Sequence, residues 1–411
     1  EFQKPRFFAY DPDLCAHGAR GLGGCRQCID ACATDAAFSI GEKIEVDPYL
    51  CQGCGSCATV CPTGAIRYAA PEAGDLLDSL RRLCAAYRSA CRNSAGEQTA
   101  GDMAHSPAAP AIVLFSADGA SDIIESAAPK LPGHWLPVAV EDAGSVGLET
   151  WFSLLAFGAG QIMLLTGPDP ASGLVKASQG QIEVAGAILE ALGDRHCKSR
   201  ILLWPGQLEL PKQALEIPPI GDVPGTFGAL GNKRETARLA LAHLHEQAVA
   251  AADMEIVDIA SLPDQAMFGS IDVDRDACTL CMACVSVCPA SAIQAGGEHP
   301  RLNFREDHCV QCGLCATACP ETAITLQARM NFDAQLAPSE RVLNEQEMQH
   351  CNDCGKAFAT RQMINRMLEK LSGHWMYQNE QARQRLRLCE DCRIKQMWDD
   401  NGAIEVHPGE R

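Results

Sequence analysis

Four short runs of cysteines carry the clearest chemistry in this sequence. Each holds four cysteines, and three share one spacing, with two, two and three residues between successive cysteines and a proline after the last. Thiolates bind soft metals, and runs with this spacing are ligand patterns for iron–sulfur clusters. We therefore expect the chain to carry electrons. The runs are Cys51, Cys54, Cys57, Cys61; Cys278, Cys281, Cys284, Cys288; Cys309, Cys312, Cys315, Cys319; and the stretched Cys15, Cys25, Cys28, Cys32.

The runs form two pairs, and each pair resembles a bacterial eight-iron ferredoxin. In that pattern the fourth cysteine of each run serves the cluster of the other run. The resemblance implies four [4Fe–4S] clusters with crosswise ligands, each moving one electron at a time. The expected ligand sets are Cys15, Cys25, Cys28 and Cys61; Cys51, Cys54, Cys57 and Cys32; Cys278, Cys281, Cys284 and Cys319; and Cys309, Cys312, Cys315 and Cys288.

The first run departs from the pattern in two places. The insertion 16–24 widens the first spacing to nine residues, and Ala33 stands where the pattern has proline. We still expect Cys15 to be a ligand. The open alternatives are a cluster with three cysteine ligands or Cys15 as a separate thiol; for the other runs they are zinc or free thiols.

Two further cysteine pairs lie near the end of the chain. Cys351 and Cys354 form one pair, and Cys389 and Cys392 form the other. Two such pairs suit a tetrahedral four-thiolate zinc site. We expect zinc here, in a zinc-ribbon-like helical tail with helices over 360–371 and 379–397. A fifth iron–sulfur cluster, unmetallated thiols, or His350 replacing one ligand are the alternatives.

The positions of the cysteine runs indicate how the chain divides into domains. We expect an α+β multidomain protein in which two ferredoxin-like modules, each with two [4Fe–4S] clusters, flank an α/β parallel-sheet domain, followed by the tail. The expected boundaries are 1–71 for the first module, 72–252 for a flavodoxin-like α/β domain with a loop at 92–110, 253–328 for the second module, and 329–411 for the tail. Short strands are predicted in the modules at 37–40, 43–46, 65–68, 291–294, 301–304 and 323–327.

Hydrophobic runs and helical periodicity alternate in the middle domain. Near-continuous apolar strands between helices predict a parallel sheet covered on both faces. Strands are expected at 111–115, 135–140, 161–165 and 200–204, and helices at 74–91, 121–128, 145–157, 174–192 and 233–250.

The middle domain contains no convincing nucleotide fingerprint. The glycine-rich segment 18–24 lacks the preceding strand, and 225–233 lacks the adjacent Gly-Lys-Ser/Thr of a phosphate loop. The turn at 166–170 lies where open α/β sheets bind ligands, but a simple strand-to-helix turn is the plainer interpretation. Cys84, Cys91 and Cys197 have no metal spacing, and Cys84 is expected in the core.

Segments 138–147, 154–159 and 161–166 are similar to the small delta subunit of methyl-viologen-reducing hydrogenases. That family has cysteines in these loops for a [2Fe–2S] cluster. This chain has Glu141, Ser145 and Thr166 there. The resemblance therefore implies the fold and a docking role, without a further redox centre.

The net charge and the many cysteines limit the expected partners and the expected compartment of the protein. The formal net charge of the 411 residues is -18, which argues against nucleic-acid and anionic-membrane binding. Clusters need reduced thiols, so we expect a cytoplasmic protein. No signal peptide or membrane span is visible. The sequence begins without Met, so a missing upstream segment stays open.

The whole chain resembles multi-cluster ferredoxin-like proteins of proteobacteria, on the cysteine runs together with 351–356 and 388–393. The resemblance implies a carrier that relays electrons between redox partners, for example a formate-dehydrogenase-type oxidoreductase. The basic tail could dock an acidic partner or be a solvated helix face. Two other functions stay open: an enzyme subunit whose α/β domain binds flavin or nucleotide, and an assembly factor for a metalloenzyme. The oligomeric state is open.

Overall fold

A computed structural model gives the fold of the protein. It describes residues 7–69, 73–96, 108–206, 216–229, 231–251, 256–297 and 299–399. The chain divides into two compact units. The first comprises 1–270, 306–314 and 326–339, and the second comprises 271–305, 315–325 and 340–411. The division passes through the second cysteine module, since the loop with Cys309 and Cys312 belongs to the first unit.

The first module is a small α+β fold in the first unit. Strand β1 (Phe8–Tyr10) pairs antiparallel with β6 (Ile66–Tyr68), and β4 (Ala37–Ile40) pairs antiparallel with β5 (Lys43–Val46). Two short helices, α1 (Gln27–Asp30) and α2 (Ser56–Val60), each follow a cysteine loop. The two halves repeat the same layout, as the pattern of paired runs predicts.

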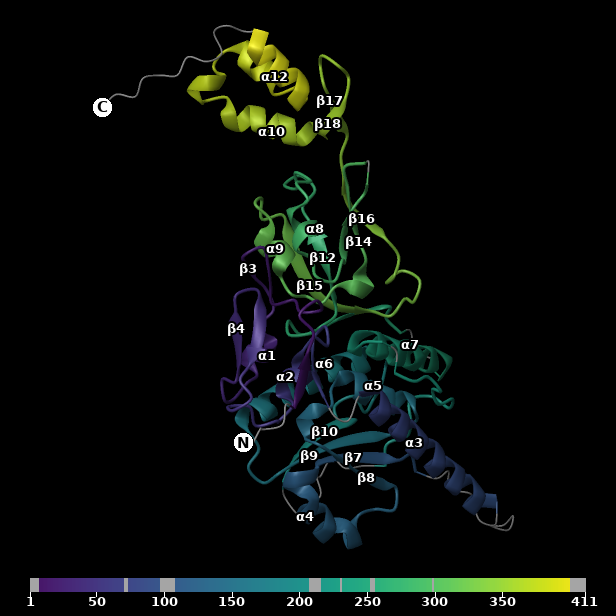
Figure 1. Ribbon diagram of the computed structural model, residues 1–411. Coiled ribbons are helices and arrows are strands. Elements are labelled where there is room, and N and C mark those ends of the chain that lie inside the picture. Colours follow the sequence, from purple (N-terminus) through teal and green to yellow (C-terminus); the bar gives the residue numbers. More distant parts are fainter. Residues whose placement is uncertain are drawn as a thin grey trace. The chain divides into compact units, whose positions relative to one another are not determined.

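A four-stranded parallel sheet forms the centre of the first unit (Figure 1). Its order is β10-β9-β7-β8, so the chain first adds a strand on one side of β7 and then continues on the other. The prediction of a parallel sheet is confirmed. The strands are β7 (Ala111–Ser116), β8 (Trp135–Val140), β9 (Gln161–Thr166) and β10 (Ile201–Pro205).

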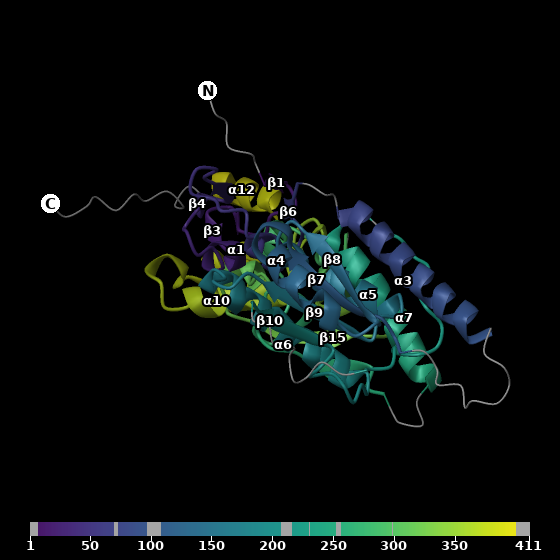
Figure 2. The ribbon, with the colours of Figure 1, turned by 90° about the horizontal axis from the view of Figure 1, so that it is seen from below.

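Helices cover both faces of this sheet. One face packs on α5 and α6, with α3 and α7 beyond α5, and the other face packs on α4. Figure 2 shows α3, α5 and α7 running beside one another. The helices are α3 (Ala73–Gly96), α4 (Ala117–Ala127), α5 (Leu148–Ala156), α6 (Ser172–Ala191) and α7 (Lys233–Ala251).

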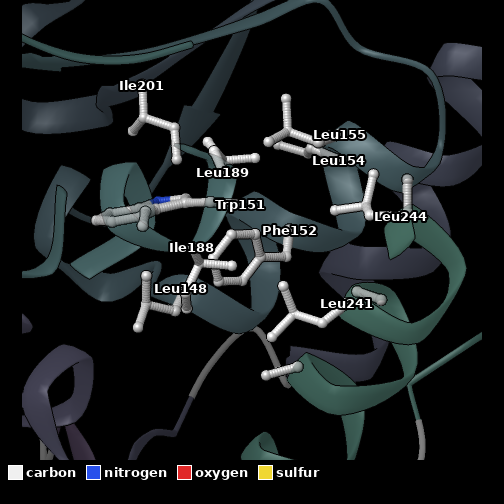
Figure 3. Close-up of a cluster of buried hydrophobic side chains, with 14 of the residues drawn as sticks. Leu148, Trp151, Phe152, Leu154, Leu155, Ile188, Leu189, Ile201, Leu241 and Leu244 are labelled. Carbon is white, nitrogen blue, oxygen red and sulfur yellow. The ribbon is translucent and has the colours of Figure 1, made fainter. Parts of the chain in front are cut away.

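The largest core lies between the sheet and α5. Trp151 and Phe152 are fully buried there against Ile188 of α6 and Leu241 of α7 (Figure 3). Helix α5 is buried along its whole length, so it is an internal helix of the domain. Cys84 is also fully buried in this core, as its place on an apolar helix face predicts.

Several predicted boundaries differ from the structure. Helix α3 continues to Gly96, so the predicted loop at 92–110 is helical at its start, and 97–107 lies outside the described residues. Helix α5 begins only at Leu148, after a short 3-10 turn at Ala143–Ser145. The predicted tail helix over 379–397 is two helices, α11 (Glu380–Arg385) and α12 (Glu390–Asp399).

The second unit holds most of the second module and the tail. Strands β13 (Ile293–Ala295), β14 (Arg301–Phe304) and β16 (Arg341–Glu345) form an antiparallel sheet. The tail adds the hairpin β17 (Met348–His350) and β18 (Ala357–Thr360) and the helix α10 (Arg361–Leu371). The module's own helices are α8 (Ala283–Val287) and α9 (Leu314–Ala318).

The remaining strands lie near the sequence positions at which the chain passes from one unit to the other. Strand β11 (Ile259–Ser261) pairs antiparallel with the end of β15 (Ile324–Asn331) in the first unit. Strand β12 (Gly269–Val273) and the 3-10 turn Glu306–His308 complete this region. In the part of the chain that the structure describes, no helix combines the length and the apolar character needed to cross a membrane.

Candidate iron–sulfur cluster sites

The first site surrounds a cavity in the first module that encloses about 410 Å³. Cys51, Cys54 and Cys57 reach it from one loop, and Cys32 reaches it from the other half of the module. Burial acts to raise the pKa of Cys32, but hydrogen bonds from the backbone N–H groups of Ala37 and Thr34 bring it below its usual range. Such N–H groups also stabilise the sulfurs of a bound cluster. The cavity brings together the crosswise set that the sequence predicts.

The second site explains the stretched run. Residues 18–23 form a hairpin, in which β2 (Gly18–Ala19) pairs with β3 (Leu22–Gly23). The Cys25 N–H donates to the carbonyl of Ala16 at 2.9 Å, so the hairpin closes on itself and returns Cys15 to the side of Cys25. The insertion therefore lengthens the spacing along the chain without separating the two thiols.

A cavity of about 310 Å³ lies beside this hairpin. The buried His17 ties the hairpin down, because its Nδ1 lies 2.8 Å from the Cys25 carbonyl and its Nε2 2.7 Å from the Ser39 hydroxyl. Sequence reasoning missed His17, since nothing in its local pattern distinguishes it. The cysteines that line the cavity are Cys15, Cys25, Cys28 and Cys61.

The third site lies in the second unit and encloses about 350 Å³. Its lining includes Cys278, Cys281, Cys284 and Cys319. The backbone N–H of Ala323 points at the Cys319 sulfur, 3.3 Å away. This set again takes three cysteines from one run and the fourth from the other.

The fourth predicted set is divided between the two units. Cys309 and Cys312 belong to the first unit, and Cys288 and Cys315 belong to the second. The Nε2 of Gln311 donates to the Cys309 sulfur at 3.3 Å and to the Ser270 carbonyl at 2.9 Å, which fixes that part of the loop. The complete set stays a prediction.

Burial and repulsion between neighbouring thiolates raise the pKa of several cysteines in these sites. Burial raises the pKa of Cys25, Cys28 and Cys284 to about 12, and neighbouring thiolates of the same set push in the same direction. Burial also raises the pKa of Cys57 well above its usual value. Four thiolates therefore cannot share such a cavity unless cations compensate their charge. Binding a metal cluster would supply those cations and release the protons.

The tail brings its two cysteine pairs into one group. The sulfurs of Cys351, Cys354, Cys389 and Cys392 all lie within 4.8 Å of one another. Burial opposes ionisation of Cys351, but backbone N–H groups of Cys354 and Cys389 lower its pKa to about 6. Thiolates at this mutual distance can ligate a single metal ion. His350 is outside the group, and its Nδ1 lies 3.0 Å from the Gly355 carbonyl, so the alternative in which it replaces a cysteine is disfavoured.

The carboxyl edge of the parallel sheet contacts the first module. Thr59 of α2 donates to the carbonyl of Gly144, which lies just beyond β8. A Cβ at Gly55 would lie 2.5 Å from the Gly144 carbonyl carbon, and one at Gly173 would lie 2.6 Å from the Ala31 carbonyl oxygen. These glycines allow backbone to touch backbone. The edge where open α/β sheets bind ligands is thus in contact with the cysteine loops here.

Comparison with known proteins supports the interpretation of the runs. Residues 277–324 match the 4Fe-4S dicluster domain family, and residues 44–67 match the 4Fe-4S binding domain family. The chain contains two 4Fe-4S ferredoxin-type domains. The stretched run lies outside the matched part of the first of these domains.

Two curated relatives share a short segment with the chain. Both are indolepyruvate oxidoreductase subunits IorA. The one from Pyrococcus horikoshii is 50% identical over 44 residues, and the one from Archaeoglobus fulgidus is 42% identical over 43 residues. Each match covers 10% of this chain and 7% of the relative. The similarity fits an iron–sulfur electron-transfer role of the kind found in oxidoreductase subunits.

Proposed function

We propose that the protein relays single electrons between redox partners through [4Fe–4S] clusters held by its four crosswise cysteine sets. The observation that carries this proposal is the gathering of four cysteines around each of three cavities, with each set drawn from both halves of a module. Bound clusters would supply the one-electron chemistry. The chain's part is to supply thiolates, direct backbone N–H groups at the sulfurs and exclude water.

The α/β domain is proposed to be a support for the first ferredoxin-type domain. Its carboxyl edge contacts the cysteine loops through Gly144 and Gly173, which disfavours the alternative of a flavin or nucleotide there. The glycine-rich segment 225–233, which lacks the full pattern of a phosphate loop, has another role, since Lys233 donates to two carbonyls of α2. A flavin spectrum in the purified protein would overturn the support role.

The tail is proposed to bind one structural zinc ion. Its four sulfurs are close enough for a tetrahedral site, and Lys356 pairs with Asp391 across the two cysteine pairs at 3.4 Å. The cytoplasm is the proposed location because all these thiols must stay reduced. The partner is proposed to be an oxidoreductase; a formate-dehydrogenase type is the one that the sequence resemblance implies.

Elemental analysis tests the proposal most directly. We expect about 16 irons per chain, from four four-iron clusters, together with one zinc. A count near eight irons would contradict four clusters, and no iron would contradict the relay altogether. Zinc that disappears in Cys392→Ser while iron stays constant would assign it to the tail. EPR spectra of the reduced protein should show several [4Fe–4S] signals.

The assembly-factor alternative predicts a different result. If the protein only helps to build a metalloenzyme, Cys57→Ser and Cys284→Ser would leave electron flow through an assembled partner unchanged. A relay predicts that both variants slow that flow. The two outcomes separate the functions without knowledge of the natural donor.

A further inference from the structure

Two cysteine loops from different modules meet inside the first unit. Gly24 directly precedes Cys25, and a Cβ there would lie 2.6 Å from the Cγ of Leu314. Leu314 is fully buried and lies two residues beyond Cys312. We call the Cys25 set and the Cys309–Cys312 loop the inner sites.

Helix α7 begins beside these inner sites with two buried cations. The first is Lys233, whose side chain is 10% exposed. Its Nζ donates to the carbonyls of Ala58 at 2.8 Å and Thr59 at 2.5 Å. These carbonyls lie between Cys57, a ligand of the Cys51 set, and Cys61, the inner-site ligand that follows α2. Glu149 lies 3.7 Å away and offsets part of the charge.

The second cation, Arg234, serves the other module. Its Nε donates to the Asp307 carbonyl at 2.8 Å and its Nη1 to the Met267 carbonyl at 2.5 Å. The guanidinium also lies over the Phe268 ring, 4.9 Å from the centroid, and the charge of Cys309 acts on it. Among the described residues, the buried Nη2 of Arg234 has no hydrogen-bond partner. This nitrogen can therefore still donate a hydrogen bond.

The other charges near this helix end do not cancel the pair. Glu306 is held by Arg329 through two hydrogen bonds of 2.8 and 2.6 Å. Arg238, one turn further along α7, is also buried near Asp307 and Glu306. Burial lowers the pKa of Arg234 to about 9, which leaves it protonated at neutral pH. A positive field therefore remains where the two modules meet.

We propose that Lys233, with Arg234 next to it on α7, raises the reduction potential of the inner site of the first module, which is the Cys25 set. The inference rests on the proposed function, because it requires bound clusters. Reduction adds one negative charge and changes no bond, so a buried cation nearby stabilises the reduced form. The electron comes from the other site of the first module, the Cys51 set, when that site is reduced, and it later passes to an oxidised acceptor.

A redox titration of the full chain followed by EPR tests this inference. Lys233→Gln keeps a donor for the Ala58 and Thr59 carbonyls but removes the charge. We expect it to shift one midpoint potential to more negative values, and Lys233→Arg to retain the original value. Lys43→Gln is the matched control, because it removes an exposed lysine of the same module, where water screens the charge.

Each outcome separates the inference from the proposed function. Unchanged midpoints in Lys233→Gln, with full iron content, would overturn the inference and leave the relay intact. An equal shift in Lys233→Arg would show that geometry and not charge is responsible, which also overturns it. If Lys233→Gln loses iron, Arg234→Gln removes the neighbouring charge at the same helix end and provides the same measurement, with Arg234→Lys as its charge-preserving control. Wild-type protein without iron would instead refute the relay itself.

Discussion

The two ferredoxin-type domains place the same backbone conformation on different residues. In the first, the loop between Cys51 and Cys57 has left-handed residues at Gly53 and Gly55, with φ of 77° and 80°. In the second, the equivalent positions after Cys278 are Leu280 and Met282, with φ of 54° and 61°. Glycine adopts this region freely, whereas other residues pay about 1 kcal/mol or more. The ligand spacing therefore imposes the conformation, and glycine only eases it.

Contact with a neighbour explains why the first domain uses glycine. Gly55 touches the backbone of Gly144 in the α/β domain, where any side chain would collide. At the equivalent position of the second domain, Met282 carries a side chain and lines the cavity of the Cys278 set. Gly55 thus lets its loop dock on another domain, whereas Gly313, between two cysteines of the second domain, has nothing within 4 Å of a Cβ.

Replacing single cysteines should have the largest effect. It tests whether, in both domains, the fourth cysteine of each run is a ligand of the other run's cluster. We expect Cys61→Ser to empty the site of Cys25, and Cys319→Ser to empty the site of Cys284, each with a loss of about four irons. EPR should show that Cys61→Ser and Cys25→Ser lose the same signal. Cys197→Ser, a half-buried thiol outside every set, is the control. Loss of the Cys54 signal in Cys61→Ser would contradict crosswise ligation.

Replacing Gly55, which contacts the α/β domain, should cost more stability than replacing the equivalent Met282. Gly55→Ala adds a Cβ 2.5 Å from the Gly144 carbonyl carbon and also strains a left-handed residue. We expect a loss of about 2–4 kcal/mol in the free energy of unfolding of the first unit. Met282→Ala introduces no new strain, because the wild-type residue already has a Cβ, and should cost less than the Gly55 change. Thermal unfolding of the holoprotein measures both; equal losses would remove the distinction between the loops.

Valine at Gly24 should loosen the junction between the modules. The new side chain would collide with Leu314 and with the Ala16 carbonyl, and overpacking of this kind costs about 1–3 kcal/mol. We expect weaker magnetic interaction between reduced clusters of the two domains in EPR spectra. Gly23→Val is the matched control, since nothing lies within 4 Å of a Cβ there. If both variants keep the wild-type interaction, the loops at Gly24 and Leu314 are not where the domains exchange electrons.

Much of the fold could be predicted because its signals are local. The apolar runs at 135–140 and 161–165 predict their strands almost to the residue, although only β9 is buried along its whole length and the edge strand β8 is partly exposed. Three of the crosswise cysteine sets that the ferredoxin resemblance implies line cavities, and their ligation stays a prediction. Sequence reasoning failed at Asn379–Met397, where helical periodicity continues across a turn at 386–389 that lets Cys389 turn toward Cys351.

Long-range contacts account for what local patterns missed. The insertion before Gly24 looks like a loop, and only the pairing of Ala19 with Leu22 shows that it is a hairpin. Lys233 resembles the end of a phosphate loop in sequence, yet its partners Ala58 and Thr59 lie some 170 residues away. Neither partner carries a side-chain signal, because the bonds are to backbone carbonyls. Such contacts can be identified only in the folded chain.

Replacing Leu280 or Met282 with glycine should have the smallest effect. It is also the closest comparison between the two cysteine loops, because it gives the second loop a residue that the first already has. Replacement would relieve the left-handed strain in the folded state but would also free the unfolded chain, and the two terms nearly cancel. We expect Met282→Gly to change the free energy of unfolding by less than about 1 kcal/mol, with the EPR signal of the Cys284 site unchanged. A large change in midpoint potential would show that these side chains tune the cluster. Glycine between ligands in the first domain would then also matter for potential and not only for docking.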